Sequence, residues 1–119
     1  MRMLLDDGVV RRDDVALVGA RSLDPPEVEF MAETGIDDSL ERTLEDVDAA
    51  YVALDLDVLD PGEADVFFPE PNGPSSAEIE AVLRDVAARS SLAGVGITGF
   101  LATERNAGVI VRMLAAAGL

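Results

Sequence analysis

The chain has 119 residues, of which 49% are hydrophobic, and 24 acidic against 9 basic side chains give a formal net charge of −15. This length suffices for one domain with a buried core, so we expect a single domain over residues 1–119. The charge argues against nucleic acid or an anionic membrane as partner, because phosphates would repel the chain. It favours cationic ligands, either metal ions or organic cations.

The sequence contains no cysteine, no histidine and no lysine. Their absence excludes disulfides, thiolate catalysis, serine–histidine catalysis, histidine-ligated metal sites and lysine Schiff bases within this chain. No apolar run approaches the ~20 residues of a membrane span, and Met1–Leu5 lacks the longer apolar core of a signal peptide. We therefore expect a cytoplasmic protein.

The N-terminal part of the chain predicts one strand and two helices. Val15–Ala20 is an apolar run typical of a buried strand. Asp24 precedes two prolines, which suits a helix start with Asp24 as its N-cap, and Glu27–Thr34 continues this helix until Gly35 ends it. Asp37–Asp48 has apolar residues at helical spacing and predicts the second helix.

The centre of the chain predicts a strand that ends in a group of carboxylates. Ala50–Leu54 is an uninterrupted apolar run that suits a strand buried on both faces. Asp55, Asp57 and Asp60 follow directly, and Pro61 stops the segment. Residues two apart on an extended chain point the same way, so Asp55 and Asp57 are expected to direct two carboxylates at one point.

Two ionised carboxylates that meet in this way repel each other unless a cation lies between them. The simplest such cation is a hard divalent metal ion, so Asp55 and Asp57 are predicted metal ligands. The plainer alternative is a strand end that carries solvated turn residues.

The C-terminal half predicts a loop, a helix, a strand and a final helix. Residues 62–76 contain three prolines and two glycines and are expected to form a long loop. A helix follows with apolar residues at helical spacing, then a glycine-rich buried strand over Leu92–Phe100 and a helix over Thr103–Leu119.

The alternation of strands and helices indicates an α/β fold. We expect a three-layer α/β/α arrangement with a mainly parallel sheet. Ligands of such sheets bind beyond the carboxyl ends of the strands. Asp24, Asp55 and Asp57 all fall at predicted strand ends, which links the fold to the predicted site.

Two stretches, LDLDVLDP at residues 54–61 and GARSLDPPE at 19–27, resemble motifs of the ureohydrolase family, which includes arginase, agmatinase and formimidoylglutamase. The resemblance implies a partial arginase-like fold, corresponding to the C-terminal part of that family. It implies that Asp55 bridges two manganese ions and that Asp57 binds one of them. It further implies that Asp24 contacts the substrate, with Glu27 as a supporting carboxylate.

The sequence also departs from the family pattern. The family's upstream motifs, which supply histidines and further aspartate ligands, do not occur here. Ala53 stands where the family commonly has serine, and Thr98 or Gly99 stands where the family places a glutamate that holds the substrate. No residue of this chain is therefore assigned a catalytic role, and whether the chain is an enzyme is left open.

The resemblance implies hydrolysis of a guanidino or amidine C–N bond by a complete protein, with this chain inactive alone. One alternative is a degenerate, non-catalytic domain that self-associates, since a partial parallel sheet has open edges; a homo-oligomer is expected. Another is a haloacid-dehalogenase-type phosphatase in which Asp55 accepts the phosphoryl group. That class requires a later basic residue and a later acidic pair, and the sequence has no lysine and no paired acids after residue 85.

Overall fold

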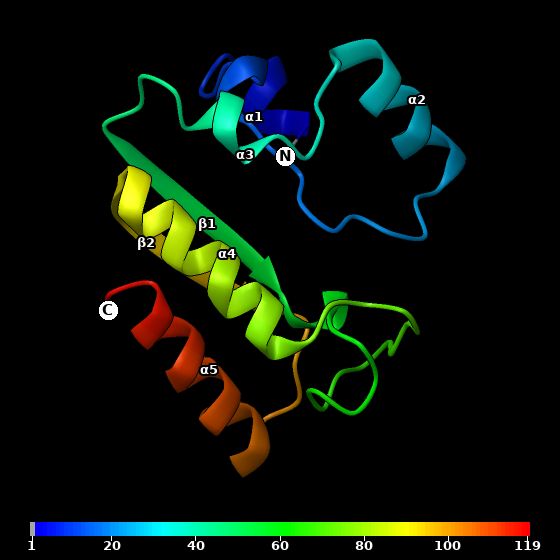
Figure 1. The fold of residues 1–119 in the computed structure, drawn as a ribbon. Coiled ribbons are helices and arrows are strands. Elements are labelled where there is room, and N and C mark those ends of the chain that lie inside the picture. Colours follow the sequence, from blue (N-terminus) through cyan, green and yellow to red (C-terminus); the bar gives the residue numbers. More distant parts are fainter. Residues whose placement is uncertain (1) are drawn as a thin grey trace. The chain divides into compact units, whose positions relative to one another are not determined.

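The computed structural model describes residues 2–119. The chain divides into two compact units, one ending at Val47 and one over Asp48–Leu119, and each is described by itself (Figure 1). The expectation of a single domain stays a prediction. None of the helices formed by residues 2–119 is long and apolar enough to cross a membrane.

Between residues 2 and 47 the first unit consists of short helical segments joined by turns. Its elements are α1 (Arg2–Asp6), the 3₁₀ helix η1 (Arg12–Asp14), α2 (Pro25–Thr34) and α3 (Leu40–Thr43). The predicted helix after Asp24 is confirmed as α2. It ends at Gly35, whose φ of 68° is the left-handed conformation that favours glycine at this position.

The predicted strand over Val15–Ala20 is wrong. This segment has no strand pairing, and Val18 and Gly19 form a turn. Its N-terminal half makes one backbone contact with another segment, in which the Leu17 N–H donates to the Asp37 carbonyl at 2.8 Å. An apolar run becomes a strand only where a neighbouring strand accepts its hydrogen bonds, and residues 2–47 form no strand.

The predicted helix over Asp37–Asp48 is much shorter in the structure. Only α3 is helical, and its N-cap is Ser39, whose side chain accepts a hydrogen bond from the Arg42 N–H at 3.4 Å. Asp46 adopts a φ of 61°, which a right-handed helix cannot accommodate. The helical spacing of the apolar residues therefore does not extend the helix past its first turn.

The second unit is a parallel strand pair with two helices. Its elements are β1 (Ala49–Asp55), the 3₁₀ helix η2 (Leu56–Val58), α4 (Ser76–Arg89), β2 (Ser91–Thr98) and α5 (Glu104–Ala116). The two strands run parallel, with Ala49 opposite Ser91 and Asp55 opposite Thr98. The α/β class and the parallel pairing are thus confirmed.

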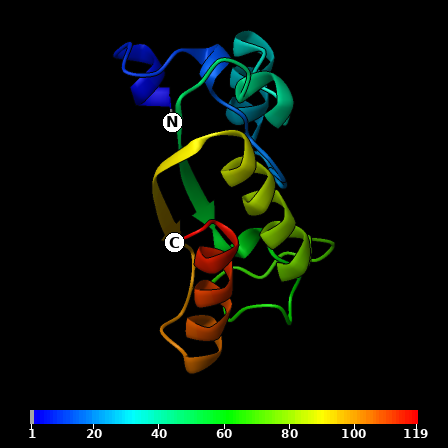
Figure 2. The ribbon, with the colours of Figure 1, turned by 60° about the vertical axis from the view of Figure 1, so that its left-hand side comes forward.

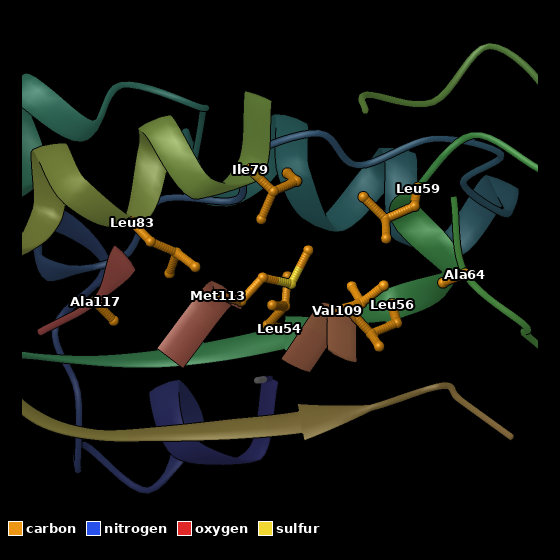
Figure 3. Close-up of a cluster of buried hydrophobic side chains, with 9 residues drawn as sticks. All are labelled: Leu54, Leu56, Leu59, Ala64, Ile79, Leu83, Val109, Met113 and Ala117. Carbon is orange, nitrogen blue, oxygen red and sulfur yellow. The ribbon is translucent and has the colours of Figure 1, made fainter. Parts of the chain in front are cut away.

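The core of this unit lies between the strands and the two helices. Leu54 of β1 packs against side chains of α4 and α5, and Leu56 and Met113 have no exposed surface (Figure 3). In Figure 2 both helices lie on the same side of the strand pair. The cluster comprises Leu54, Leu56, Leu59, Ala64, Ile79, Leu83, Val109, Met113 and Ala117. Burying these side chains is the main stabilising contribution to the unit.

The opposite face of the strand pair is open. The exposure of β1 alternates along the strand, and Tyr51 is 68% exposed, so the expectation of a strand buried on both faces is wrong. The reason is that α4 and α5 both cover the face that carries Leu54. On the open face the Tyr51 ring lies over Gly94 and Gly96, where added Cβ atoms would meet it.

Candidate metal and substrate site

Asp55 is the last residue of β1, and its side chain is held by groups from both strand ends. One carboxylate oxygen, Oδ2, accepts a hydrogen bond from the Thr98 hydroxyl at 3.3 Å. The other, Oδ1, accepts from the backbone N–H of Asp57 at 3.4 Å. Because β1 and β2 are parallel, both strand ends reach the same edge of the sheet, and the carboxylate lies there.

Gly99, directly after β2, leaves the space that this carboxylate occupies. Its φ is 72°, and a Cβ atom added to it would overlap Oδ1 of Asp55 and lie 2.9 Å from the carboxylate carbon. Any larger residue at this position would have to displace Asp55 and adopt an unfavourable backbone conformation.

Asp57 lies in η2 and not on a continuation of β1. The chain turns here because Leu56 and Leu59, which are 0% and 1% exposed, both enter the core. The alternation argument for Asp55 and Asp57 therefore does not hold beyond Asp55. The two residues are still neighbours, linked by the hydrogen bond from the Asp57 N–H to the Asp55 carboxylate.

Asp60, the third carboxylate of the stretch, holds the following loop. Its Oδ2 accepts a hydrogen bond from the Asn72 N–H at 2.9 Å, and its own N–H donates to the Pro74 carbonyl at 3.0 Å. Gly73 lies against this backbone so closely that an added Cβ would be 2.6 Å from the Leu59 carbonyl carbon. The Asp60 side chain thus has a structural partner in the loop.

Glu63 and Asp65 fix the same loop to α4 and α5. Glu63 accepts from the Ser76 N–H at 2.9 Å and from its hydroxyl at 2.7 Å, and these bonds hold the pKa of the Glu63 carboxyl below its ordinary value. Asp65 accepts from the Thr103 hydroxyl at 2.7 Å. The predicted long loop is therefore confirmed as irregular, and it is tied at several points.

Asp24 and Glu27 lie together at the start of α2, in the first unit. The Asp24 N–H donates to the Glu27 carboxylate at 2.9 Å, which is one half of a capping box. Both residues thus have a local structural role. Their predicted contact with substrate stays a prediction.

The oxygen atoms at the end of β1 suit a hard divalent cation by type. A carboxylate oxygen has about two acceptor positions, so each Asp55 oxygen keeps one after its hydrogen bond. Within residues 2–119, however, no group of three or more histidine, cysteine, aspartate or glutamate side chains could hold a metal ion. Asp55 and Asp57 can therefore supply part of a coordination sphere, and the described residues do not complete it.

Sequence reasoning missed the roles of Thr98, Gly99 and Asn72. The sequence shows a threonine and a glycine near the end of the predicted glycine-rich strand. Only the strand register, which sets Asp55 opposite Thr98, reveals that these two residues contact the Asp55 carboxylate. The contact between Asp60 and Asn72 joins two parts of an irregular loop, and no periodicity predicts it.

Comparison with known proteins identifies similar chains. The model of the arginase family matches residues 1–100. Comparison with curated protein sequences gives no match.

Several solved structures are similar in fold. Arginase from Bacillus caldovelox is 26% identical with a TM-score of 0.74, over 91% of this chain and 43% of that one. Arginase from Bacillus cereus is 26% identical with a TM-score of 0.78, over 91% and 45%. Formimidoylglutamase from Bacillus subtilis, at 17% identity, has a TM-score of 0.80 over 99% and 46%, which shows a shared fold. The chain spans less than half the length of these proteins.

Proposed function

The chain belongs to the arginase family, and we propose that it is part of a manganese-dependent ureohydrolase that hydrolyses a guanidino or amidine C–N bond. The observation that carries this proposal is the position of Asp55. Its carboxylate lies at the carboxyl ends of two parallel strands and is oriented by Thr98. Ligands of α/β proteins bind at such strand ends.

In this proposal Asp55 and Asp57 hold two manganese ions together with ligands from residues outside this chain. When bound, the ions would supply Lewis-acid activation of the water that attacks the guanidino or amidine carbon. Asp55 provides a carboxylate with a fixed orientation, and Asp57 lies next to it in η2. Asp24 and Glu27 would contribute negative charge that attracts a cationic guanidino or amidine substrate.

We further propose that this chain alone is catalytically inactive and acts in the cytoplasm as part of a larger or assembled protein. The test incubates the purified chain with Mn²⁺ and, separately, arginine, agmatine and formimidoylglutamate, and measures release of urea, ammonia or formamide. We expect no release above that of a protein-free blank. Release of any of these products would overturn the proposed inactivity, and its loss in Asp55→Asn would locate the activity.

Self-association without catalysis is a second candidate function, favoured by the open sheet face. Tyr51 is 68% exposed on that face, beside two glycines that add no polar cover. Sedimentation equilibrium should then show a homo-oligomer that Tyr51→Ser weakens. A monomer at all concentrations would contradict this candidate.

Mg²⁺-dependent phosphatase turnover that Asp55→Asn abolishes would instead favour the phosphatase alternative.

A further inference from the structure

The Asp55 side chain is exposed, yet three neighbouring groups define where its carboxylate lies. The Thr98 hydroxyl donates to Oδ2 at 3.3 Å, and the Asp57 N–H donates to Oδ1 at 3.4 Å. The third is Gly99, which has no side chain and so leaves the space in which Oδ1 lies. Two of the three groups come from the end of β2, in the register that sets Asp55 opposite Thr98.

An exposed aspartate without such contacts exchanges among staggered rotamers. A carboxylate that must serve as a metal ligand benefits from a fixed orientation, because outer partners that orient a ligand add to metal affinity. The Thr98 hydroxyl is suited to this role because it donates to one oxygen and leaves an acceptor position on each oxygen unused.

We propose that Thr98 and Gly99 are positioning residues for Asp55: the Thr98 hydroxyl orients the carboxylate, and Gly99 provides the space in which it lies. The consequence for metal binding rests on the proposed function. The consequence for the Asp55 side-chain conformation does not, because it follows from contacts within this chain.

The chemistry of position 98 follows from this arrangement. Asp55 needs a donor there, so serine can replace threonine, whereas valine keeps the branched shape but removes the hydrogen bond. A carboxylate at position 98 would be an acceptor only and would repel Asp55. The end of β2 therefore accommodates a single carboxylate, that of Asp55 at the end of β1.

The test measures the χ1 rotamer of Asp55 by NMR, from three-bond couplings in isotope-labelled protein. Wild type and Thr98→Ser are expected to show the couplings of one rotamer, and Thr98→Val the averaged couplings of several. A single rotamer retained in Thr98→Val would overturn the role of Thr98, whatever the protein does with metal.

Gly99→Ala has a matched control in Gly118→Ala. Gly118 also has a positive φ, of 81°, but its added Cβ would meet nothing within 4 Å. Both variants carry the backbone strain, so a change of the Asp55 rotamer in Gly99→Ala alone supports the proposal. Unchanged Asp55 couplings in a folded Gly99→Ala would overturn the role of Gly99.

Titration with Mn²⁺ provides the second readout, as paramagnetic broadening of the Asp55 amide signal. Thr98→Val is expected to weaken this binding about tenfold, and Thr98→Ser to restore it. If Mn²⁺ does not broaden Asp55 in wild type, Asp55 and Asp57 do not hold the ion without ligands from outside this chain, while the coupling measurements still decide the positioning roles. If Mn²⁺ binds equally well to Thr98→Val and wild type, the hydroxyl does not serve the metal site.

Discussion

Asp65 and Asn106 exchange two hydrogen bonds: the Asp65 N–H donates to Asn106 Oδ1 at 2.9 Å, and Asn106 Nδ2 donates to the Asp65 carbonyl at 2.6 Å. Asn106 is 1% exposed, and Nδ2 also donates to the Leu101 carbonyl at 2.8 Å. This one side chain therefore joins α5 to the loop after β1 and to the exit of β2.

Replacing Asn106 with alanine should lower the free energy of unfolding by about 3 kcal/mol, because it removes a buried side chain that makes three hydrogen bonds to the backbone of Asp65 and Leu101. Denaturant unfolding followed by the fluorescence of Tyr51, the chain's one tyrosine, measures the change. Asn72→Gly is the control. Asn72 has a φ of 65°, which glycine accepts, and it donates to Asp60 through its backbone N–H, which glycine also has. A loss below about 1 kcal/mol in Asn106→Ala would contradict the role given to this residue.

Two glycines of the second unit should respond to alanine in opposite directions. Gly73→Ala should destabilise by about 2–3 kcal/mol, because the new Cβ overlaps the backbone of Val58–Asp60. Gly108→Ala, inside α5, should stabilise by about 1 kcal/mol, because its nearest contact is 3.9 Å away and alanine is the better helix former. Equal effects of the two substitutions would show that the loop does not pack on that backbone.

The sequence predicts those elements whose signals are local. Asp24 and Gly35 delimit α2, and the apolar spacing within residues 76–89 and 104–116 corresponds to α4 and α5. The run at Ala50–Leu54 becomes β1 because a partner strand is available. The same kind of run at Val15–Ala20 does not become a strand, because pairing depends on a neighbour that local sequence does not specify.

In the candidate site, too, the features with local sequence signals can be predicted, and those that depend on tertiary contacts cannot. Asp55 at a strand end follows from the order of residues. The turn at Asp57 does not, because it results from Leu56 and Leu59 both entering the core. The contact of Thr98 with Asp55 depends on the strand register, which becomes visible only when the two strands are placed side by side.

The Glu63 carboxylate should make stability depend on pH in acid. Its pKa is lowered in the folded state, first by the hydrogen bond from the Ser76 N–H and then by the one from its hydroxyl. A lowered folded-state pKa gives stability that is present above the ordinary value of 4.5 and lost as the pH falls through the folded-state value. Glu63→Gln should therefore be less stable than wild type near neutral pH.

The difference between Glu63→Gln and wild type should shrink as the pH falls below the ordinary value of 4.5 and through the lowered folded-state pKa, because the wild-type carboxylate then becomes protonated. Denaturant midpoints measured across this range by Tyr51 fluorescence check the prediction. Glu29→Gln removes an acidic side chain of α2, outside the second unit, and is the control for net charge. A stability difference between Glu63→Gln and wild type that stays constant with pH would mean that the charge of Glu63 does not contribute to the free energy of unfolding.

Substitutions of Asp24 should separate its capping role from its charge. Asp24→Ala should lower the protection of α2 amides against hydrogen exchange by about 1 kcal/mol, because alanine cannot cap a helix. Asp24→Ser removes the charge but keeps a capping side chain, so the protection should stay close to that of wild type. Equal losses in both variants would show that the charge, through the helix dipole, is what stabilises α2.

Mn²⁺ binding should distinguish the three aspartates of residues 55–60. Asp55→Asn and Asp57→Asn should each weaken binding about tenfold or more, because each removes a charged oxygen ligand. Asp60→Asn should leave the affinity nearly unchanged, because the Asp60 side chain accepts the Asn72 N–H in the loop. Calorimetric titration checks the order, and the largest loss in Asp60→Asn would contradict the assignment of the ligands.

The parallel pairing of β1 and β2 also sets how the second unit folds. A pairing such as Ala53 with Gly96 joins segments separated by the whole of the loop and α4, so no tight turn can nucleate the sheet. High contact order of this kind slows folding, since the entropy of closing the connection is lost before the strands meet. The hydrogen bonds from Asn72 to Asp60 and from Ser76 to Glu63 shorten the effective connection. The carboxylates of Asp60 and Glu63 should therefore increase the rate at which β1 and β2 pair and the strand end with Asp55 forms.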